Sequence, residues 1–536
     1  MTKRIVWLLP AVCLGLQAAE PFRLGPYPQK FRTFYELKDA RVPGALRDAP
    51  QPMPVGGLRA AAVASDGALW LGFADGLVRY DPGANALDRR QYLAGRRYLP
   101  DDEIVNLAPD AAGGVWARTK TGVAHIELRP MTLAAKAAVF EQRVEERHNR
   151  YGMVASSHLR QPGEVASNEP VSSDNDGLWT AMYGAAECFR YAVTRSPEAL
   201  ARARRSVRAL LFLEQVTGRP GFPARSYVKR GDARPQDGEW HWTRDGQYQW
   251  KGDTSSDEIV GHYFLFSIAC DRLPDEALKK PIRETVTRIT DHIIQRGYNL
   301  TDIDGQPTLW GRWSPEYFAT PRGKPDSPLN ALELLSILKT AAHITGQARY
   351  ETEYQKAARQ LKYAELTTRL LELREELNYS DEELAMLSFY PLFCYEKDPA
   401  LTGYYRRALQ AWWENIQREK NPLWTFIYLS AWNKLAAAPA VDLPGAVRTL
   451  YRTPVDLIEW TVRNSHRNDI VLGGGLDRFQ RPQTTSLLPP DERPIMKCNG
   501  NPFRIDGGSG GRGEDDGAFF LLPYWMGRCH RYLLGE

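Results

Sequence analysis

Two hydrophobic patterns divide the chain. From residue 57 to about residue 130, apolar and polar positions alternate in short segments separated by glycine turns, the pattern of half-buried strands. From residue 131 onward, apolar positions recur every three or four residues, the pattern of amphipathic helices. The sequence therefore predicts a small antiparallel β subdomain within residues 20–130 and a helical domain over residues 131–536.

Two kinds of helix alternate in the second region. One kind is charged with a single apolar stripe, and it is predicted at 132–148, 197–216, 275–296, 349–376, 399–418 and 443–463. The other is apolar on nearly all sides, and it is predicted at 176–194, 256–270, 329–345, 381–394, 422–436 and 515–533. A helix that is apolar all round must be buried. Six such pairs predict a mainly α fold, an (α/α)6 toroid with the apolar helices inside, whereas a solenoid or an irregular bundle is the alternative.

The first residues have the pattern of an export signal. Lys3 and Arg4 precede an apolar run from Ile5 to Leu16, and small residues follow it. This order is typical of a secretory signal peptide, and the run is too short for a transmembrane helix. We expect residues 1–19 to be removed, although an uncleaved anchor is the alternative. The mature protein is then periplasmic or secreted, with no integral membrane segment.

Two resemblances accompany these patterns. Segments 64–82 and 108–126 each combine glycine turns with an alternating strand, centred on Trp70 and Trp116, which lie 46 residues apart. They resemble the propeller repeats of bacterial two-component sensor proteins. A propeller needs more blades than two, so we expect two hairpin-like units with both tryptophans in their cores. The helical region resembles six-hairpin glycosidases and toroidal polysaccharide lyases, which implies an enzyme that acts on carbohydrates.

Carboxylates gather where three of the apolar helices begin. In a toroid the N-terminal ends of the inner helices surround one mouth, and a helix cap needs only one oxygen acceptor. Crowded carboxylates repel one another and raise the pKa of at least one, which supplies the acid and the ionised partner that glycoside hydrolysis needs. The candidate catalytic residues, in order of preference, are Asp176, Asp253, Asp515, Asp174, Asp257 and Asp516. Ser-x-x-Glu patterns predict capping roles for Glu258 and Glu383.

Aromatic and basic residues fill two connections of the same rim. Exposed tryptophan rings stack on sugar rings, and arginine binds a carboxylate through two hydrogen bonds. The candidate substrate-binding residues are Trp240, His241, Trp242, Trp250, Trp310, Arg312, Trp313 and Arg225. Together they favour a carbohydrate substrate, with a uronic acid as one option. We expect two or three of these five tryptophans to face solvent or ligand.

Charge and motifs narrow the function further. The net charge of +4 comes without a basic stripe, so we expect no nucleic-acid partner. No cofactor, zinc or other metal motif occurs, although Asp174, Asn175 and Asp176 offer oxygen ligands of the kind that Ca²⁺ prefers. Cys498 and Cys529 are the only plausible disulfide partners. The leading hypothesis is an exported glycoside hydrolase. The alternatives are a polysaccharide lyase that uses Tyr, His and Arg, and a non-catalytic glycan-binding or sensor protein.

Overall fold

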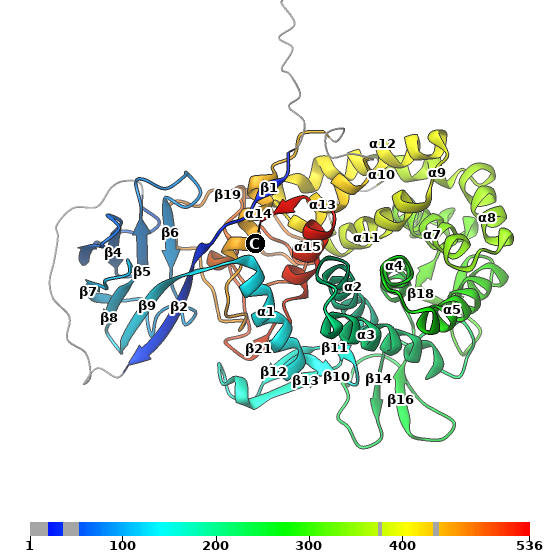
Figure 1. The fold of residues 1–536 in the computed structure, drawn as a ribbon, viewed down its shortest axis with the longest axis horizontal. Coiled ribbons are helices and arrows are strands. Elements are labelled where there is room, and N and C mark those ends of the chain that lie inside the picture. The colour runs from blue at the N-terminus through cyan, green and yellow to red at the C-terminus, as the bar shows by residue number, and fades with distance from the viewer. Residues whose placement is uncertain (1–19, 36–52, 374–377, 433–438, 536) are drawn as a thin grey trace, which may run out of the picture.

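The computed structural model describes residues 20–35, 53–373, 378–432 and 439–535. The predicted signal segment lies outside the described residues. Strands near the N-terminus form a subdomain beside a larger helical region (Figure 1). The mainly helical class with small antiparallel sheets is confirmed. No described helix is long and apolar enough to cross a membrane.

The β subdomain consists of two four-stranded antiparallel sheets. One contains β3 (Ala60–Val63), β4 (Leu69–Phe73), β5 (Gly76–Tyr80) and β6 (Arg90–Leu93) in chain order. The other has the order β2 (Tyr27–Tyr35), β9 (Val123–Met131), β8 (Val115–Thr119) and β7 (Ile104–Pro109). Each unit is thus larger than the expected hairpin, and β2, which precedes both repeats along the chain, completes the second sheet.

The two repeat tryptophans have different surroundings. Trp70 is fully buried in a core that both sheets share, and its indole N–H donates to the Gly113 carbonyl at 3.0 Å. Trp116 is half-buried and stacks on His125, with ring centroids 4.0 Å apart. Trp70 is therefore a core residue as predicted, whereas Trp116 lies at the edge of the core.

The apolar helices pack against one another in a closed series. They are α2 (Asp176–Thr194), α4 (Ser256–Arg272), α7 (Gly323–Thr345), α11 (Tyr379–Tyr395), α13 (Pro422–Ser430) and α15 (Ala518–Cys529). Each contacts the next, and α15 contacts α2. Glycines permit close approach, since a Cβ at Gly261 of α4 would lie 2.8 Å from the Cα of Leu178 in α2.

The charged helices cover this series. They are α1 (Leu133–Arg143), α3 (Pro197–Gln215), α5 (Glu276–Gln295), α8 (Ala348–Gln355), α12 (Pro399–Ile416) and α14 (Leu443–Arg452). Helix α3 contacts α2, α5 and α8 contact α7, α12 contacts α11, α14 contacts α13, and α1 contacts α15. Each charged helix therefore places its apolar stripe on one or more of the apolar helices.

Several helix boundaries differ from the sequence patterns, and α7, for example, begins at Gly323 rather than at residue 329. Helix α14 ends at Arg452 because Pro454 restricts the residue before it to extended backbone. Helix α15 begins only at Ala518, because Gly517 has a left-handed φ of 81°. The segment predicted as a single helix over 349–376 breaks after α8 into a π-turn (Lys356–Gln360) and the short helices α9 (Tyr363–Leu366) and α10 (Leu370–Leu373).

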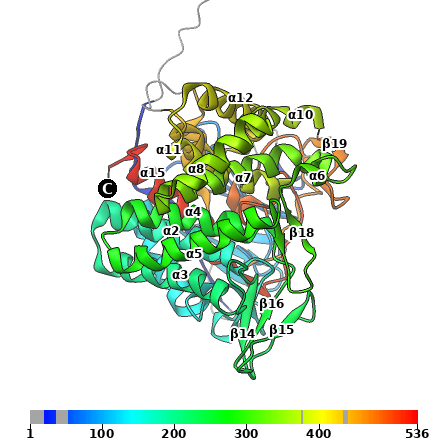
Figure 2. The same ribbon diagram turned by 90° about the vertical axis from the view of Figure 1, so that its right-hand side faces the viewer.

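Short strands form the connections between helices. Strands β14 (Ser226–Lys229), β15 (Trp240–Trp242) and β16 (Tyr248–Lys251) make one sheet that projects beside α3 (Figures 1 and 2). Strands β17 (Asn299–Thr301) and β18 (Pro307–Arg312) pair with each other, as do β19 (Leu472–Leu476) and β20 (Pro482–Thr484). Strand β12 (Ser156–Leu159) lies between β13 (Asn168–Val171) and β21 (Gly513–Glu514). β1 (Phe22–Arg23) pairs in parallel with β22 (Leu533–Leu534), so the two ends of the described chain lie together.

A buried ionic network joins the β subdomain to the helical region. Arg452, at the end of α14, is fully buried and lies 3.2 Å from Asp88, 2.7 Å from Asp491 and 3.0 Å from Glu492. Lys30 of β2 also pairs with Asp491. Because each buried charge has a partner of opposite sign, the network links the two parts through directed contacts.

The described cysteines are all free thiols. Cys188, Cys270, Cys394, Cys498 and Cys529 form no disulfide. The suggested pairing of Cys498 with Cys529 is therefore wrong. Cys498 lies in the loop before α15, whereas Cys529 is the last residue of that helix, and a helix of this length separates them along its axis.

Candidate active site

Acidic side chains from several apolar helices influence one another at the N-terminal ends of those helices. Asp257 lies in the first turn of α4, Glu383 in the second turn of α11, and Asp515 and Asp516 directly before α15. Glu333 lies deeper, in the third turn of α7. We call these five residues the carboxylate cluster. Helix N-terminal ends carry partial positive charge, so this position favours an ionised carboxylate.

Lys497 supplies the positive charge of the cluster. Its ammonium lies 3.1 Å from Asp516 Oδ2 and 4.1 Å from the ring centre of Trp179 in the first turn of α2. The Lys497 side chain is 16% exposed, so the pair is close to solvent but largely shielded from it. Burial alone would lower the pKa of Lys497, but the charges of Asp516, Asp515 and Glu383 outweigh burial and raise it. The lysine is therefore a cation at neutral pH.

Asp515 and Asp516 are adjacent in the chain, but their pKa values are shifted in opposite directions. Burial and the charge of Asp516 raise the pKa of Asp515 to about 7. Burial also acts on Asp516, but the charges of Lys497 and His148 and a hydrogen bond from the Ala518 N–H, 2.7 Å long, hold its pKa below the ordinary value. At neutral pH the pair can thus hold one proton and one negative charge. A split of this kind is what an acid and base pair requires.

Two further acids of the cluster are held protonated. Burial, with the charge of Asp257 adding to it, raises the pKa of Glu333 and of Glu383 to about 8. Glu333 accepts a hydrogen bond of 2.7 Å from the indole of Trp313. Burial also raises the pKa of Asp257, which is the one acid of the cluster with a partly exposed side chain. Asp257 is therefore the acid best placed to meet a ligand.

Asp176 and Asp253, the first two catalytic candidates from the sequence, make hydrogen bonds that hold the surrounding loops. Asp176 is fully buried and accepts hydrogen bonds from Arg150, from Ser226 and from the backbone and hydroxyl of Ser173, the last two at 2.9 Å. Asp253 has a left-handed φ of 46°, and its carboxylate accepts from the Leu309 N–H at 2.8 Å. These contacts hold loops together and leave Asp176 no surface for a ligand.

Asp174 is exposed and forms an ion pair. Its carboxylate pairs with Lys251 and lies 3.5 Å from Arg225. These contacts hold the pKa of Asp174 below its ordinary value although burial opposes them. Asp174 remains an ionised surface group, so it cannot act as an acid near neutral pH.

Neither Ser-x-x-Glu pattern forms the expected capping box. Ser255 makes no side-chain cap of α4, and Glu258 instead accepts from the Gly177 N–H of α2 at 3.2 Å. Burial and the charge of Asp176 raise the pKa of Glu258 well above its ordinary value. Helix α11 begins two residues earlier than the pattern implies, with Asn378 as its cap, so Glu383 faces the buried cluster. Both capping predictions are wrong.

The five rim tryptophans divide by exposure. Trp242 is 53% and Trp310 is 46% exposed, and Trp240 is half-buried. Each has an arginine over its ring, Arg230, Arg322 and Arg234 respectively. Trp250 and Trp313 are buried. Three rings thus remain available for contact with a ligand, within the expected number.

The other predicted binding residues hold the rim in shape. Arg312 donates to the carbonyls of Thr308 and Pro307 at 2.8 and 3.2 Å. His241 lies against Trp250, with ring centroids 4.6 Å apart, and its buried Nε2 has no hydrogen-bond partner. Arg225 is mostly buried beside Asp174. His241 Nε2 and Arg225 Nε are therefore buried polar atoms without a described hydrogen-bond partner.

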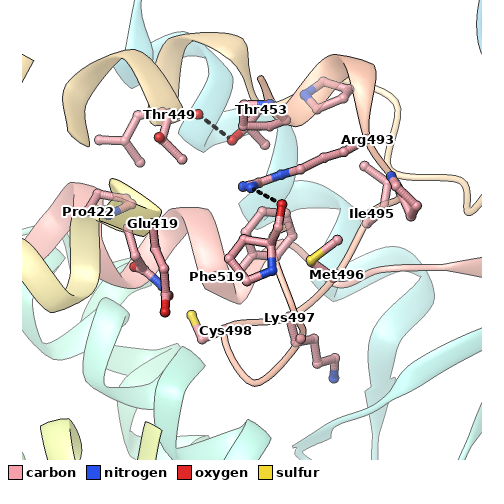
Figure 3. Close-up of a pocket in the computed structure, with 17 residues that line it drawn as sticks. Glu419, Pro422, Thr449, Thr453, Arg493, Ile495, Met496, Lys497, Cys498 and Phe519 are labelled. Atoms are coloured by element: carbon pink, nitrogen blue, oxygen red, sulfur yellow. Dashed lines mark hydrogen bonds between the residues drawn. The ribbon is translucent and has the colours of Figure 1, made fainter. Parts of the chain in front are cut away.

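A narrow pocket borders Lys497. It lies between the start of α13, the end of α14 and the loop that carries Met496, Lys497 and Cys498 (Figure 3). Glu419 lines one side, and burial raises its pKa to about 7. Arg493 lines the other, and burial lowers its pKa to about 10. The pocket therefore places one acidic side chain, Glu419, and one basic side chain, Arg493, beside the loop that carries Lys497.

Within the described ranges, no group of three or more His, Cys, Asp and Glu side chains is arranged to hold a metal ion. Asp174 and Asp176, the residues considered for Ca²⁺, are paired with Lys251 and Arg150 instead. A cation there would have to displace both ion pairs.

Sequence reasoning missed Lys497, Glu333 and Glu383 as site residues. A glutamate inside an otherwise apolar helix is a signal that applies to Glu333, because a buried acid needs a specific reason to be there. Glu383 was instead assigned a capping role, because its spacing from Ser380 fits a capping box. Lys497 lies in irregular structure and carries no such signal.

The sequence matches no protein-family model, and no curated protein is significantly similar to it. Among solved structures, the chain is similar to that of a metagenome-derived glycoside hydrolase family 9 endoglucanase, with 12% sequence identity and a TM-score of 0.31. The match covers 85% of this chain and 96% of that chain. The case for a function therefore comes from the geometry of this chain's own residues.

Proposed function

We propose that this protein is an exported carbohydrate-active enzyme that cleaves a glycosidic bond by carboxylate acid and base chemistry. The closed series of apolar helices is then the inner ring of an (α/α)6 toroid, and the carboxylate cluster lies at its mouth. The observation that carries the proposal is the split pair of Asp515 and Asp516 beside Lys497. Glycoside hydrolysis needs one protonated carboxyl and one ionised carboxylate on either side of the bond.

The roles of Asp515 and Asp516, which are both buried, follow from charge, and that of Asp257 follows from access. Asp515, with a pKa of about 7, is the proposed general acid that protonates the leaving oxygen. Asp257, partly exposed on α4, is the proposed second carboxylate, which activates water or stabilises the positive charge that develops on the sugar. Asp516, held ionised by Lys497, keeps the proton on Asp515 until the leaving oxygen takes it. The exposed rings of Trp242 and Trp310 are available to hold neighbouring sugars.

Elimination is the alternative chemistry, and three of the side chains that could serve it, His262, Tyr263 and Tyr317, are engaged elsewhere. Both ring nitrogens of His262 lie within 3.1 Å of backbone carbonyls, and the residue is fully buried. The hydroxyl of Tyr263 is buried against Thr290, and that of Tyr317 donates to Asp326. These contacts argue against those three residues as the base of an elimination, whereas the buried Nε2 of His241 has no hydrogen-bond partner.

A panel of neutral and uronate-containing glycans tests the proposal. The purified protein is incubated with each glycan, and reducing ends are measured together with absorbance near 235 nm, where an unsaturated uronate absorbs. New reducing ends without absorbance support hydrolysis. New ends with absorbance would replace the proposal by a lyase, and binding without product would replace it by a glycan-binding protein.

A further inference from the structure

A basic cleft opens beside the carboxylate cluster. It has a volume of about 450 Å³ and lies between the first residues of α11, the β19–β20 hairpin and the loop around residues 496–504. Its lining includes four arginines and a single carboxylate, Asp477. We call it the arginine cleft, after Arg418, Arg478, Arg481 and Arg504.

Within the ranges that the structure describes, only one of the four arginines has a carboxylate partner. Asp477 pairs with Arg481 at 2.8 Å and also accepts from the backbone N–H groups of Phe479 and Arg481. Among the described residues, no carboxylate lies within 4.0 Å of the other three guanidinium groups. Burial, with the neighbouring charge of Arg481, lowers the pKa of Arg504. The cleft therefore favours an anion.

Aromatic and amide groups lie among the arginines. Phe479 is 63% exposed, and the guanidinium groups of Arg478 and Arg481 lie 5.1 and 4.6 Å from its ring centre. Asn499 and Gln483 add amide donors and acceptors to the lining. An apolar face, hydrogen-bonding amides and arginines that have no carboxylate partner in the described part of the chain together match a sugar ring that carries an anionic group.

The arginine cleft is continuous with the candidate active site. Met496 and Gly500 line both the cleft and the narrow pocket that contains Lys497. Tyr379, in the first turn of α11, lines the cleft, and Glu383 follows it four residues later in the cluster. Residues four apart lie on the same face of a helix. A ligand in the cleft would thus extend toward the carboxylates.

We propose that the arginine cleft binds the carboxylate or sulfate group of an acidic oligosaccharide and so presents the adjacent glycosidic bond to the carboxylate cluster. Delivery of that bond rests on the proposed function, whereas binding of the anionic group does not. Guanidinium groups hold planar oxyanions through paired hydrogen bonds, so the cleft selects acidic over neutral chains. The substrate class is accordingly an acidic glycan.

Calorimetric titration of the Asp515→Asn variant, which should not consume the ligand, tests this binding. The probes are an oligogalacturonate, a sulfated chondroitin oligosaccharide and a neutral cello-oligosaccharide of the same length. We expect at least one acidic probe to bind about tenfold or more tightly than the neutral one, and its affinity to fall as salt is raised, because salt screens charge. The preferred acidic probe distinguishes carboxylate from sulfate.

Variants that reverse the charge of arginines in the cleft test whether the acidic probe binds there. Arg478→Glu and the pair Arg418→Glu with Arg478→Glu change exposed side chains and should weaken acidic binding about tenfold or more without altering the circular dichroism spectrum. Arg407→Glu is the matched control, because Arg407 is also exposed and stacked on an aromatic ring, Tyr404, but lies on α12. Equal affinity for neutral and acidic probes, or unchanged binding in both variants, would overturn the proposal.

The two proposals fail in different ways. Cleavage of neutral glycans without any preference for acidic ones would overturn the role of the arginine cleft and leave glycosidic cleavage standing. Binding of acidic probes that depends on Arg478, with no product from any glycan, would support the cleft and overturn the proposed enzyme.

Discussion

Lys497 and Asp516 form an ion pair of 3.1 Å. This pair helps to move the pKa values of the adjacent carboxyls Asp515 and Asp516 apart. The charge of Lys497 favours the ionised form of both Asp516 and Asp515, but Asp516 lies closer, and its own charge then raises the pKa of Asp515. One lysine thereby leaves a proton on one aspartate and a charge on its neighbour. The site thus does not depend on a metal ion to create this asymmetry.

The pH profile of activity should depend on Lys497. Replacing it in Lys497→Met removes a charge that lowers the pKa of both aspartates, so both pKa values rise. The ionised carboxylate is then lost at higher pH, and the acidic limb of the kcat profile should move upward by about one unit. Lys497→Arg keeps the charge and should keep the profile. A profile that does not move in Lys497→Met would contradict this role.

The stability of the fold should fall as pH rises through neutrality. Glu333 has a pKa of about 8 in the folded state against 4.5 as the ordinary value. Between these values the folded state holds a proton that the unfolded state releases, so the free energy of unfolding decreases with pH. Glu333→Gln removes this proton exchange, and its amide oxygen can still accept from Trp313.

Urea unfolding between about pH 5.5 and pH 7.5 measures this effect. The native protein should lose on the order of 1 kcal/mol per pH unit more than Glu333→Gln does. The exposed Glu372→Gln is the control, since the Glu372 side chain is 64% exposed and pairs with Arg369. Parallel pH dependences in the native protein and in Glu333→Gln would show that Glu333 is not held protonated.

Helix positions could be predicted from the sequence more reliably than contacts between distant residues. Helix α2 covers residues 176–194, as the all-round apolar pattern predicted. The cap pattern did not reveal that Asp176 would be enclosed by Arg150 and Ser226, because those residues approach it from two other connections. Asp515 and Asp516 became candidates because two adjacent acids exceed the need of one cap, and their role stays a prediction.

The buried side chains of the site were harder to find. Glu383 was taken for a cap because its spacing from Ser380 fits one, but the helix begins at Tyr379 and turns Glu383 inward. Lys497 belongs to a loop whose path depends on packing against α13 and α14. Local sequence patterns carry no information on such packing, and the arginine cleft is formed by the same loop.

The link between the two parts of the molecule should depend on Arg452. Arg452→Leu leaves Asp88, Asp491 and Glu492 without their shared partner in a buried network. Loss of one member of a buried pair costs about 3–5 kcal/mol, so the midpoint of denaturant unfolding should fall substantially.

The matched control for Arg452 is an exposed pair. Arg349 lies 2.8 Å from Asp291, but its side chain is 53% exposed, so Arg349→Leu should cost less than about 1 kcal/mol. Similar losses in the two variants would argue against a special role for the buried network.

The turnover number of Asp515→Asn on a glycan that the native protein cleaves is the most direct test of the proposed chemistry. Asparagine keeps the shape of the side chain but cannot deliver a proton, so kcat should fall by about 10²-fold to 10⁴-fold. KM should change little, and Asp174→Asn, which alters an exposed ion pair, should retain most of the turnover. If Asp515→Asn cleaves the glycan as fast as the native protein, Asp515 is not the general acid and the carboxylate cluster is not the catalytic centre.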